Sequence, residues 1–307
     1  MLMKDKICLI TGATDGIGKE TARYLGKQNA QLILVGRNPE KGEKVRKILI
    51  EKTGNDQIEI LTADLSNMKA IRYLVERIYS RYDKLDVLIN NAGAFFAQRE
   101  ETDEGFEKTF ALNHLNYFLL TKLLLDLIKK GKNPRIINVA SGTHIGATLD
   151  FDDLQGKNDY SGWAAYKRSK LMNIMFTYKL AELLKDTPIT ANALHPGFVR
   201  TRFGDNNTGM IGIGLNLAKK IGAISIKKGA TTSVFLATSP MVKGVSGKYF
   251  VKCKPEKSSS LSYNKSDIDR LWRTTDDCLR ARCSLKTNHF IRIIATASRL
   301  NTLAVNP

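Results

Sequence analysis

Six short runs of apolar and often β-branched residues recur along the chain, and segments with helical periodicity lie between them. The runs cover residues 7–10, 31–35, 58–63, 86–90, 135–140 and 189–194. Because their hydrophobicity is continuous rather than alternating, both faces of each predicted strand are expected to be covered. A last strand is expected near residues 247–251. The pattern predicts a single α/β domain with a mainly parallel sheet of about seven strands and helices on both faces.

Helical periodicity is clearest after the third run. Apolar residues there recur at spacings of three and four, at Ile71, Leu74, Val75 and Ile78, which places them on one face of a helix. Strands alternating with helices in this way are typical of a Rossmann-type doubly wound fold. Ligands on such sheets bind beyond the carboxyl ends of the strands, so the residues that follow each run are the candidates for a site.

Three glycines follow the first predicted strand, within the motif TGATDGIG at residues 11–18. Gly12, Gly16 and Gly18 permit a tight turn and a close approach of the backbone to a pyrophosphate, and the next helix would direct its positive end at the phosphates. A glycine triplet alone also fits a structural turn. Its place between a predicted strand and a predicted helix favours dinucleotide binding.

Arg37 stands just beyond the second predicted strand, where a protein that binds NAD usually carries an acidic residue. A guanidinium can form a bidentate pair with a 2′-phosphate, so Arg37 predicts NADP(H) as the cofactor. The alternative is a solvated surface arginine. Lys19 and Lys41 could add positive potential or be ordinary surface lysines.

Tyr166 and Lys170 are four residues apart on a predicted helix and therefore lie on one face, about a turn from each other. Ionising a tyrosine near pH 7 requires its pKa to fall from about 10 to about 7, which corresponds to about 4 kcal/mol. A unit charge about 4 Å away supplies roughly 4 kcal/mol at an effective dielectric of about 20. Desolvation of the phenolate opposes this effect. On spacing alone, the two residues also fit a packing pair.

Residues 4 to about 273 resemble the short-chain dehydrogenase/reductase family. The resemblance rests on these motifs: T-G-x-x-x-G-I-G at 11–18, ADL at 63–65, NNAG at 90–93, Asn113, Ser141, Tyr166-x-x-x-Lys170 and HPGFVRT at 195–201. FDDLQ at 151–155 and the segment 163–181 are similar to the retinol dehydrogenase-like branch. Members of that branch commonly use NADP(H) on retinoids, steroids or other lipophilic carbonyls.

The resemblance implies four catalytic residues. Tyr166 would exchange a proton with the substrate oxygen, and Ser141 would form a hydrogen bond to that oxygen. Lys170 would lower the pKa of the tyrosine and hold the nicotinamide ribose, and Asn113 would help to anchor a water relay to Lys170.

A cofactor site follows from the same resemblance, with Asp64 at the adenine and the loop from Pro196 at the nicotinamide carboxamide. Its expected members are Gly12, Thr14, Asp15, Gly16, Ile17, Gly18, Arg37, Asp64, Leu65, Asn91, Ala92, Gly93, Tyr166, Lys170, Pro196, Gly197, Val199 and Thr201. Taken singly, Asp64 also fits a helix cap and Asn90 a turn former. No metal site is predicted.

The predicted function is an NADP(H)-dependent oxidoreductase that interconverts a lipophilic alcohol and its aldehyde or ketone. An apolar substrate wall is expected from Phe95, Phe96, His144, Phe151, Trp163, Phe198, Phe203 and residues 209–217. The alternative is a non-catalytic NADP-sensing or interaction protein on the same fold. Intact Ser141, Tyr166 and Lys170 argue against that alternative.

Charge and composition bound the remaining expectations. The net charge is +18, but basic residues are spread along the chain without a known nucleic-acid motif, so no nucleic acid is expected as a partner. No apolar run approaches the roughly 18 residues that a spanning helix needs. A cytoplasmic location is the default, and peripheral contact with an anionic membrane and homo-oligomer formation are left open. The four cysteines form no C-x-x-C pair and are expected to be reduced.

The chain is expected to divide into one short-chain dehydrogenase/reductase domain, residues 1–275, and a basic C-terminal tail, residues 276–307. No counterpart of the tail exists in the family pattern. It fits a disordered extension, a translation artefact or a weak amphipathic surface anchor.

Overall fold

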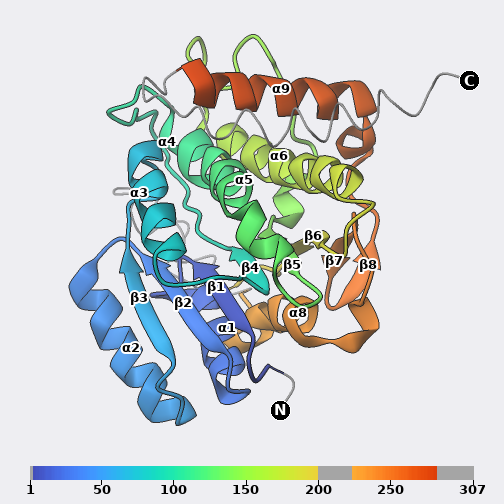
Figure 1. Ribbon diagram of the computed structural model, residues 1–307. Coiled ribbons are helices and arrows are strands. Elements are labelled where there is room, and N and C mark those ends of the chain that lie inside the picture. The colour runs from blue at the N-terminus through green and yellow to red at the C-terminus, as the bar shows by residue number, and fades with distance from the viewer. Residues whose placement is uncertain (1–2, 200–222, 282–307) are drawn as a thin grey trace, which may run out of the picture.

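A single sheet of eight strands runs through the computed structural model, which describes residues 3–199 and 223–281. The strands lie in the order β3-β2-β1-β4-β5-β6-β7-β8, and all neighbouring pairs are parallel except β7 and β8 (Figure 1). The strands are β1 (Ile7–Thr11), β2 (Gln31–Gly36), β3 (Ile58–Thr62), β4 (Val87–Asn90), β5 (Arg135–Val139), β6 (Thr190–His195), β7 (Tyr249–Val251) and β8 (Lys254–Glu256). The direction of winding reverses between β1 and β4, which is where such sheets bind their ligands.

Helices cover both faces of this sheet (Figure 1). On one face lie α1 (Gly16–Lys27), α2 (Pro39–Thr53) and α8 (Ile226–Thr238), and on the other lie α3 (Met68–Tyr79), α5 (Asn116–Lys129) and α6 (Gly162–Leu183). α9 (Lys265–Ala281) packs across the outside of α6. The short elements are α4 (Lys108–Phe110), the π-helix η1 (Ala111–Leu115) and the 3-10 helices η2 (Gly142–His144), η3 (Pro240–Val242) and η4 (Ser260–Tyr263).

Each face of the sheet has its own apolar core. Ile33 of β2 points into the core under α3, α5 and α6, whereas its neighbour Leu34 points into the core under α1, α2 and α8. Ile71, Leu74, Val75 and Ile78 form the buried face of α3, as their spacing predicts. Burial on both faces explains why the strands are apolar at successive positions.

Side chains at the helix starts fix where the helices begin. Asn38, Asn67 and Ser161 cap α2, α3 and α6, and each side-chain oxygen accepts from the backbone N–H three residues further on. These contacts satisfy N–H groups that the first turn leaves without a helical partner. Asn67 therefore caps α3, and Asp64 does not.

The predicted α/β fold is confirmed, with one strand more than the seven expected. β8 pairs antiparallel with β7 through a two-residue turn at Lys252 and Cys253, whose φ values are 48° and 65°. Positive φ at both central residues is the geometry of a type I′ hairpin turn. The strand itself reads Lys-Pro-Glu and is exposed throughout, so it has no apolar pattern that the sequence could reveal.

α9 crosses the domain boundary expected after residue 275. Its last turn includes the buried Leu279, and Asp276 forms ion pairs with Lys122 and Arg280. The helical part of the chain therefore extends to Ala281, and the expected tail would begin no earlier than residue 282, outside the described residues. The division of the chain into a domain and a tail remains a proposal, and its boundary moves from residue 275 to residue 281.

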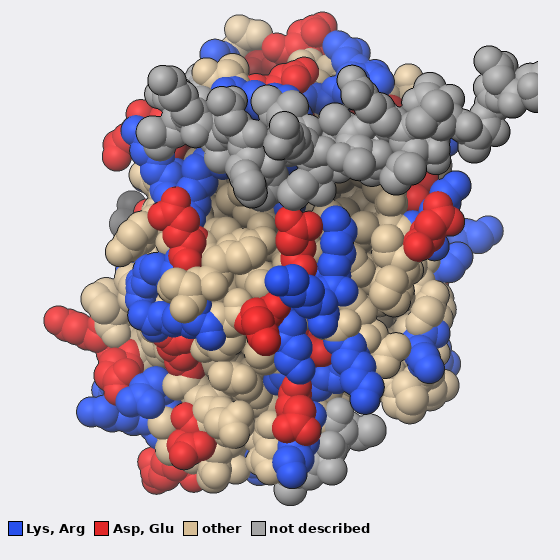
Figure 2. Space-filling view, in the orientation of Figure 1, with Lys and Arg blue, Asp and Glu red and all other residues tan. Residues whose placement is uncertain are grey.

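Basic and acidic side chains alternate on the face shown in Figure 2. The described residues include several ion pairs, such as Arg46 with Glu43. None of the helices that the structure describes combines the length and the apolar character needed to cross a bilayer.

Candidate active site

The turn from β1 into α1 is built on glycine. Gly12 and Gly16 have φ values of 63° and 49°, which L side chains rarely adopt. A Cβ atom on Gly18 would lie 2.5 Å from the carbonyl oxygen of Gly12 and 2.6 Å from Asn91 Nδ2. Gly18 is therefore packed too tightly for any larger residue, and the turn brings the N-terminus of α1 to the carboxyl edge of the sheet.

Thr11 and Asn91 hold this turn against the end of β4. The Thr11 hydroxyl accepts from the backbone N–H groups of Asn91, at 2.9 Å, and Ala92, at 3.0 Å. The Asn91 side-chain amide donates to the carbonyl oxygen of Thr11 at 2.8 Å. The Asn91 side chain thus stabilises the glycine turn through hydrogen bonds. Its expected contact with a cofactor stays a prediction.

The corner beyond β2 presents positive charge. Arg37 is exposed directly after Gly36 and has no ion-pair partner within the described ranges. Lys41, in contrast, pairs with Asp15, so much of its charge is used within the protein. A Cβ atom on Gly36 would lie 2.4 Å from Thr14 Cγ2, which shows how closely the glycine turn packs on this strand.

Asp64 and Asn90 have separate structural roles. Asp64 Oδ1 accepts from the backbone N–H and the hydroxyl of Ser66, at 2.9 and 2.7 Å. Asn90 is fully buried at the end of β4 and donates to Asn138 on β5 and to Thr121 on α5. Asp64 therefore forms a local turn with Ser66 and does not cap a helix, whereas Asn90 bridges buried elements and is not a turn former. An adenine contact by Asp64 stays a prediction.

Asn113 lies in η1, a π-helical turn between α4 and α5. Its side chain accepts from the N–H of Ala94 at 2.9 Å and donates to the carbonyl oxygen of the same residue at 3.0 Å. Its own carbonyl oxygen accepts from Asn173 Nδ2 of α6 at 2.9 Å. Asn113 therefore fixes the loop after β4, and π-helical turns of this kind are frequent at functional sites.

Tyr166, Lys170, Ser141 and Asn113 meet at the carboxyl edge of the sheet. The Lys170 ammonium group lies 5.5 Å from the centre of the Tyr166 ring and donates to the carbonyl oxygen of Val139 at 3.2 Å. A Cβ atom on Gly93 would lie 3.1 Å from Asn113 Oδ1 and 3.3 Å from Lys170 Nζ, so these groups share one small space. Tyr166 and Ser141 are joined by a side-chain hydrogen bond.

Burial controls the ionisation of this cluster. Burial raises the pKa of Tyr166 well above its usual value, and the hydrogen bond from Ser141 opposes this only in part. Burial also lowers the pKa of Lys170 to about 8. The expectation that the lysine charge dominates and lowers the tyrosine pKa is therefore not met in the protein alone. The cost of desolvating the phenolate exceeds the effect of the neighbouring charge.

The loops after β5 and β6 are connected by two histidines. His144 Nδ1 lies 2.7 Å from the carbonyl oxygen of Ser141, and His195 Nδ1 accepts from the backbone N–H of Gly142 at 2.9 Å. Burial lowers the pKa of both imidazoles. Gly197 follows with a φ of 90°, and Thr201 lies outside the described residues.

Aromatic side chains surround the phenol. The Tyr166 ring stacks on Trp163 at 5.9 Å and meets Phe95 edge-on at 6.2 Å. Trp163 and Phe198 are about half exposed, at 46% and 47%. Phe203 and residues 209–217 of the expected substrate wall lie outside the described residues.

Two members of the expected wall have other roles. Phe151 packs under the guanidinium of Arg270 on α9, at 4.5 Å, and His144 is buried in hydrogen bonds to backbone groups. Neither residue presents an apolar surface to the Tyr166 phenol, so the expectation that Phe151 and His144 belong to the substrate wall is corrected.

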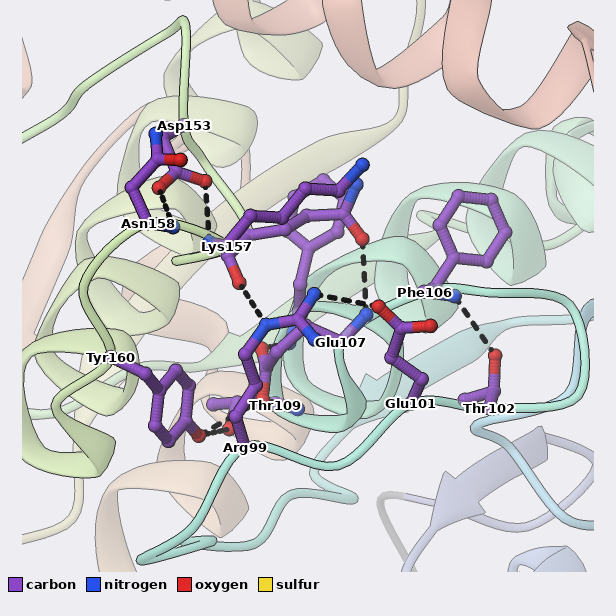
Figure 3. A network of polar contacts seen from close by, with 12 residues as sticks. Arg99, Glu101, Thr102, Phe106, Glu107, Thr109, Asp153, Lys157, Asn158 and Tyr160 are labelled. Atoms are coloured by element: carbon purple, nitrogen blue, oxygen red, sulfur yellow. Dashed lines mark hydrogen bonds and ion pairs between the residues drawn. The ribbon is translucent and has the colours of Figure 1, made fainter.

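A polar network joins the loop after β4 to the loop before α6 (Figure 3). The buried carboxylate of Glu107 accepts from the N–H groups of Thr109 and Phe110 at the start of α4, and Tyr160 donates to it at 3.1 Å. Gln155 connects the same two loops through hydrogen bonds with Glu107 and Arg99. The network holds the segments that carry the aromatic residues around Tyr166.

The sequence matches the short chain dehydrogenase family over residues 6–212. The chain belongs to this family. It is 39% identical to polyprenol dehydrogenase of Homo sapiens, over 87% of this chain and 83% of that protein. It is also 39% identical to retinol dehydrogenase 12 of Mus musculus, over 89% of this chain and 86% of that protein.

Solved structures of this fold are similar as well. A crystal structure of an uncharacterised protein from Mycobacterium paratuberculosis superimposes with a TM-score of 0.73 at 26% identity, covering 90% of this chain and 94% of that chain. A short chain dehydrogenase from Escherichia coli CFT073 complexed with NADPH has a TM-score of 0.64 at 24% identity, covering 82% and 98%. These structures show the fold, and the family membership follows from the sequence matches.

Sequence reasoning missed the supporting residues Thr11, Asn173 and His195. Thr11 and His195 stand inside the motifs quoted for the family, so only their roles were overlooked. Asn173 carried no signal, because its contact with Asn113 joins residues sixty positions apart.

Replacing Thr11 by Val is expected to lower the free energy of unfolding by about 2 kcal/mol or more, because it leaves one buried and one partly buried N–H group without an acceptor. Replacing Thr11 by Ser keeps the hydroxyl and is expected to cost only about 1 kcal/mol for the lost methyl group. Urea unfolding of the two variants and the wild type measures the difference. Equal stability of the two variants would contradict this role of Thr11.

Proposed function

We propose that this chain is an NADP(H)-dependent oxidoreductase that interconverts lipophilic alcohols and their aldehydes or ketones, with Tyr166 as the acid/base residue. One observation carries the proposal. A buried phenol, hydrogen-bonded to Ser141 and adjacent to the Lys170 ammonium group, lies at the carboxyl edge of the sheet.

The residues present fit a dinucleotide. The glycine turn leaves no room for side chains at Gly12 and Gly18, and the N-terminus of α1 offers backbone N–H groups to a pyrophosphate. Arg37, which has no ion-pair partner among the described residues, offers its guanidinium to a 2′-phosphate, which favours NADP(H) over NAD(H). When bound, the nicotinamide ring supplies or accepts the hydride. The likeness to the NADPH complex from Escherichia coli concerns the fold, so Arg37 is the residue that favours the 2′-phosphate.

The raised pKa of Tyr166 keeps the phenol protonated at neutral pH. A protonated phenol is a proton donor, which is the form that carbonyl reduction requires. Ser141 is in position to form a hydrogen bond to the same substrate oxygen. Lys170, with its pKa near 8, is mostly charged at neutral pH and stabilises the phenolate left after proton transfer. These features favour reduction as the direction in this proposal.

Asn113 acts by position rather than by contact with substrate. Its side chain holds the Ala94 backbone, and Asn173 holds its carbonyl oxygen. The expected water relay from Asn113 to Lys170 remains part of the proposal. The π-helical turn would place the start of this relay beside the ammonium group.

The apolar surroundings favour a lipophilic substrate. Ile145, Trp163 and Phe198 are exposed apolar side chains on segments next to Ser141, Tyr166 and His195. Two relatives at 39% identity are named for polyprenol and retinol, both isoprenoid alcohols. We therefore propose an isoprenoid aldehyde or alcohol as the substrate class. Steroids are the next candidates.

The alternative function, a non-catalytic sensor of NADP, has no observation in its favour. A sensor would not need Ser141, Tyr166 and Lys170 to meet in one space. A cytoplasmic location, peripheral membrane contact and homo-oligomer formation remain proposals.

Activity with NADPH is expected to be higher on a long isoprenoid aldehyde, such as retinal, than on a short water-soluble aldehyde. Replacing Phe198 by Ala is expected to lower kcat/KM for the long aldehyde about tenfold, because partial burial of such a side chain contributes about 1.5 kcal/mol. The short aldehyde and the control Tyr73→Ala, an exposed aromatic on α3, should be almost unaffected. Equal losses on both aldehydes would contradict a lipophilic substrate wall.

NADPH is expected to be preferred over NADH. Arg37→Gln should weaken NADPH binding roughly 10- to 100-fold, because a charged hydrogen bond contributes about 1.5–3 kcal/mol. NADH binding should be unchanged, and Lys41→Gln, at the same corner but paired with Asp15, should have a smaller effect. Fluorescence titration of the wild type and both variants with NADPH and with NADH measures these dissociation constants. Equal affinity of the wild type for the two cofactors would contradict the role of Arg37.

A further inference from the structure

The peptide unit between Ser141 and Gly142 is held on both sides by imidazole rings. Its carbonyl oxygen lies 2.7 Å from His144 Nδ1, and its N–H donates to His195 Nδ1 at 2.9 Å. His144 ends the 3-10 turn η2, and His195 ends β6. Two residues from different strand ends thus fix the backbone directly after the proposed substrate-binding hydroxyl.

The hydrogen bonds determine opposite tautomers for the two rings. A carbonyl oxygen only accepts, so His144 Nδ1 carries a hydrogen, and His144 Nε2 accepts from the backbone N–H of Ser259 at 3.0 Å. His195 Nδ1 accepts from Gly142 and is also 3.4 Å from the N–H of Gly197, so it carries no hydrogen. Both rings are therefore neutral, and each uses an unprotonated nitrogen as an acceptor.

We propose that His144 and His195 are positioning residues that hold Ser141 against Tyr166, and that their protonation at acid pH releases Ser141 and slows the reaction. This inference rests on the proposed role of Ser141. It assigns a function to two residues outside the four predicted catalytic ones.

Protonation is incompatible with the observed contacts. A proton on His195 Nδ1 would face the N–H of Gly142, and a proton on His144 Nε2 would face the N–H of Ser259, so in each case two donors would meet. The loop that carries Ser141 would have to move. A displacement of about 1 Å at a reacting group can cost about 100-fold in rate.

The surroundings favour the neutral rings at physiological pH. Burial lowers the pKa of both residues below 6.5, and the neighbouring His144 lowers that of His195 further. Tyr249 on β7 meets His144 edge-on at 5.0 Å, and Tyr166 lies beyond Ser141. Within residues 3–199 and 223–281, no carboxylate or ammonium group is hydrogen-bonded to either ring. The pKa values of both histidines are lower in the folded than in the unfolded protein. Their contribution to the free energy of unfolding is therefore complete above about pH 6.5 and is lost as the pH falls through the folded pKa values.

The test is kcat for carbonyl reduction against pH, with saturating NADPH, in the wild type and two variants of His195. Asn places an amide oxygen near the position of Nδ1 and does not titrate, whereas Ala removes the acceptor. We expect kcat of the wild type to fall below pH 6.5, the fall to move to lower pH in His195→Asn, and kcat of His195→Ala to be at least about tenfold lower at neutral pH. In the double variant His144→Asn/His195→Asn, the fall of kcat at acid pH (the acid limb of the profile) should be absent.

Two controls separate this inference from folding and from the proposed function. Circular dichroism at each pH shows whether a variant is folded. We also expect kcat to decline above about pH 8, where Lys170 loses its charge, and this decline should be the same in the wild type and His195→Asn. If the acid limb is unchanged in the Asn variants while Tyr166→Phe is inactive, the positioning role is wrong and the proposed function stands.

A wild type without carbonyl reductase activity would instead contradict the proposed function. The histidines can then still be tested by their ¹⁵N chemical shifts, which distinguish the two tautomers. The inference predicts a hydrogen on Nδ1 in His144 and on Nε2 in His195, and identical tautomers would overturn it.

Discussion

The central physical constraint in this protein is the burial of an ammonium group beside a phenol on one face of α6. Lys170 is only 4% exposed, and within the described residues no carboxylate neutralises it. Burying a charge without a counter-ion is costly, and the cost appears as a pKa lowered to about 8. The rest of the fold must keep this unfavourable arrangement in place, and it does so with hydrogen bonds rather than with opposite charge.

A chain of buried polar side chains provides this support. Asn90 at the end of β4 contacts Asn138 on β5, and Asn138 donates to Thr177 on α6 at 2.9 Å. Thr177 donates to the carbonyl oxygen of Asn173, whose side chain holds Asn113. The central strands, α6 and the π-helical turn are thereby fixed relative to one another. Because buried polar groups are costly when unpaired, the network strongly favours one arrangement of these elements.

Much of the fold could be predicted because the information is local in the sequence. Continuous apolar runs identify strands buried on both faces, and the glycine turn has a spacing that few other structures require. β8 could not be predicted, since its three residues are exposed and its turn uses Lys252 and Cys253 instead of glycine or asparagine.

The sequence predicted that Tyr166, Lys170, Ser141 and Asn113 belong to one site, and the structure brings these four together, but the sequence did not predict their electrostatics. Spacing places Tyr166 and Lys170 on one helix face, but spacing contains no information on burial, which raises the tyrosine pKa instead of lowering it. The roles of His144 and His195 depend on the meeting of two loops that are distant in the chain: the contact between Gly142 and His195 joins residues 53 positions apart. Such contacts follow from the sheet order, which only the structure provides.

The most direct test of the account is the turnover of Tyr166→Phe in carbonyl reduction with saturating NADPH. The substitution keeps the ring that stacks on Trp163 and removes only the proton donor, so kcat should fall at least about 100-fold while NADPH binding is retained. Tyr117→Phe is the matched control, because Tyr117 is a second buried tyrosine whose ring lies 5.9 Å from the Lys170 ammonium group, and it should change kcat little. If Tyr166→Phe keeps more than about a tenth of the wild-type kcat while chemistry limits the rate, proton donation by Tyr166 is contradicted.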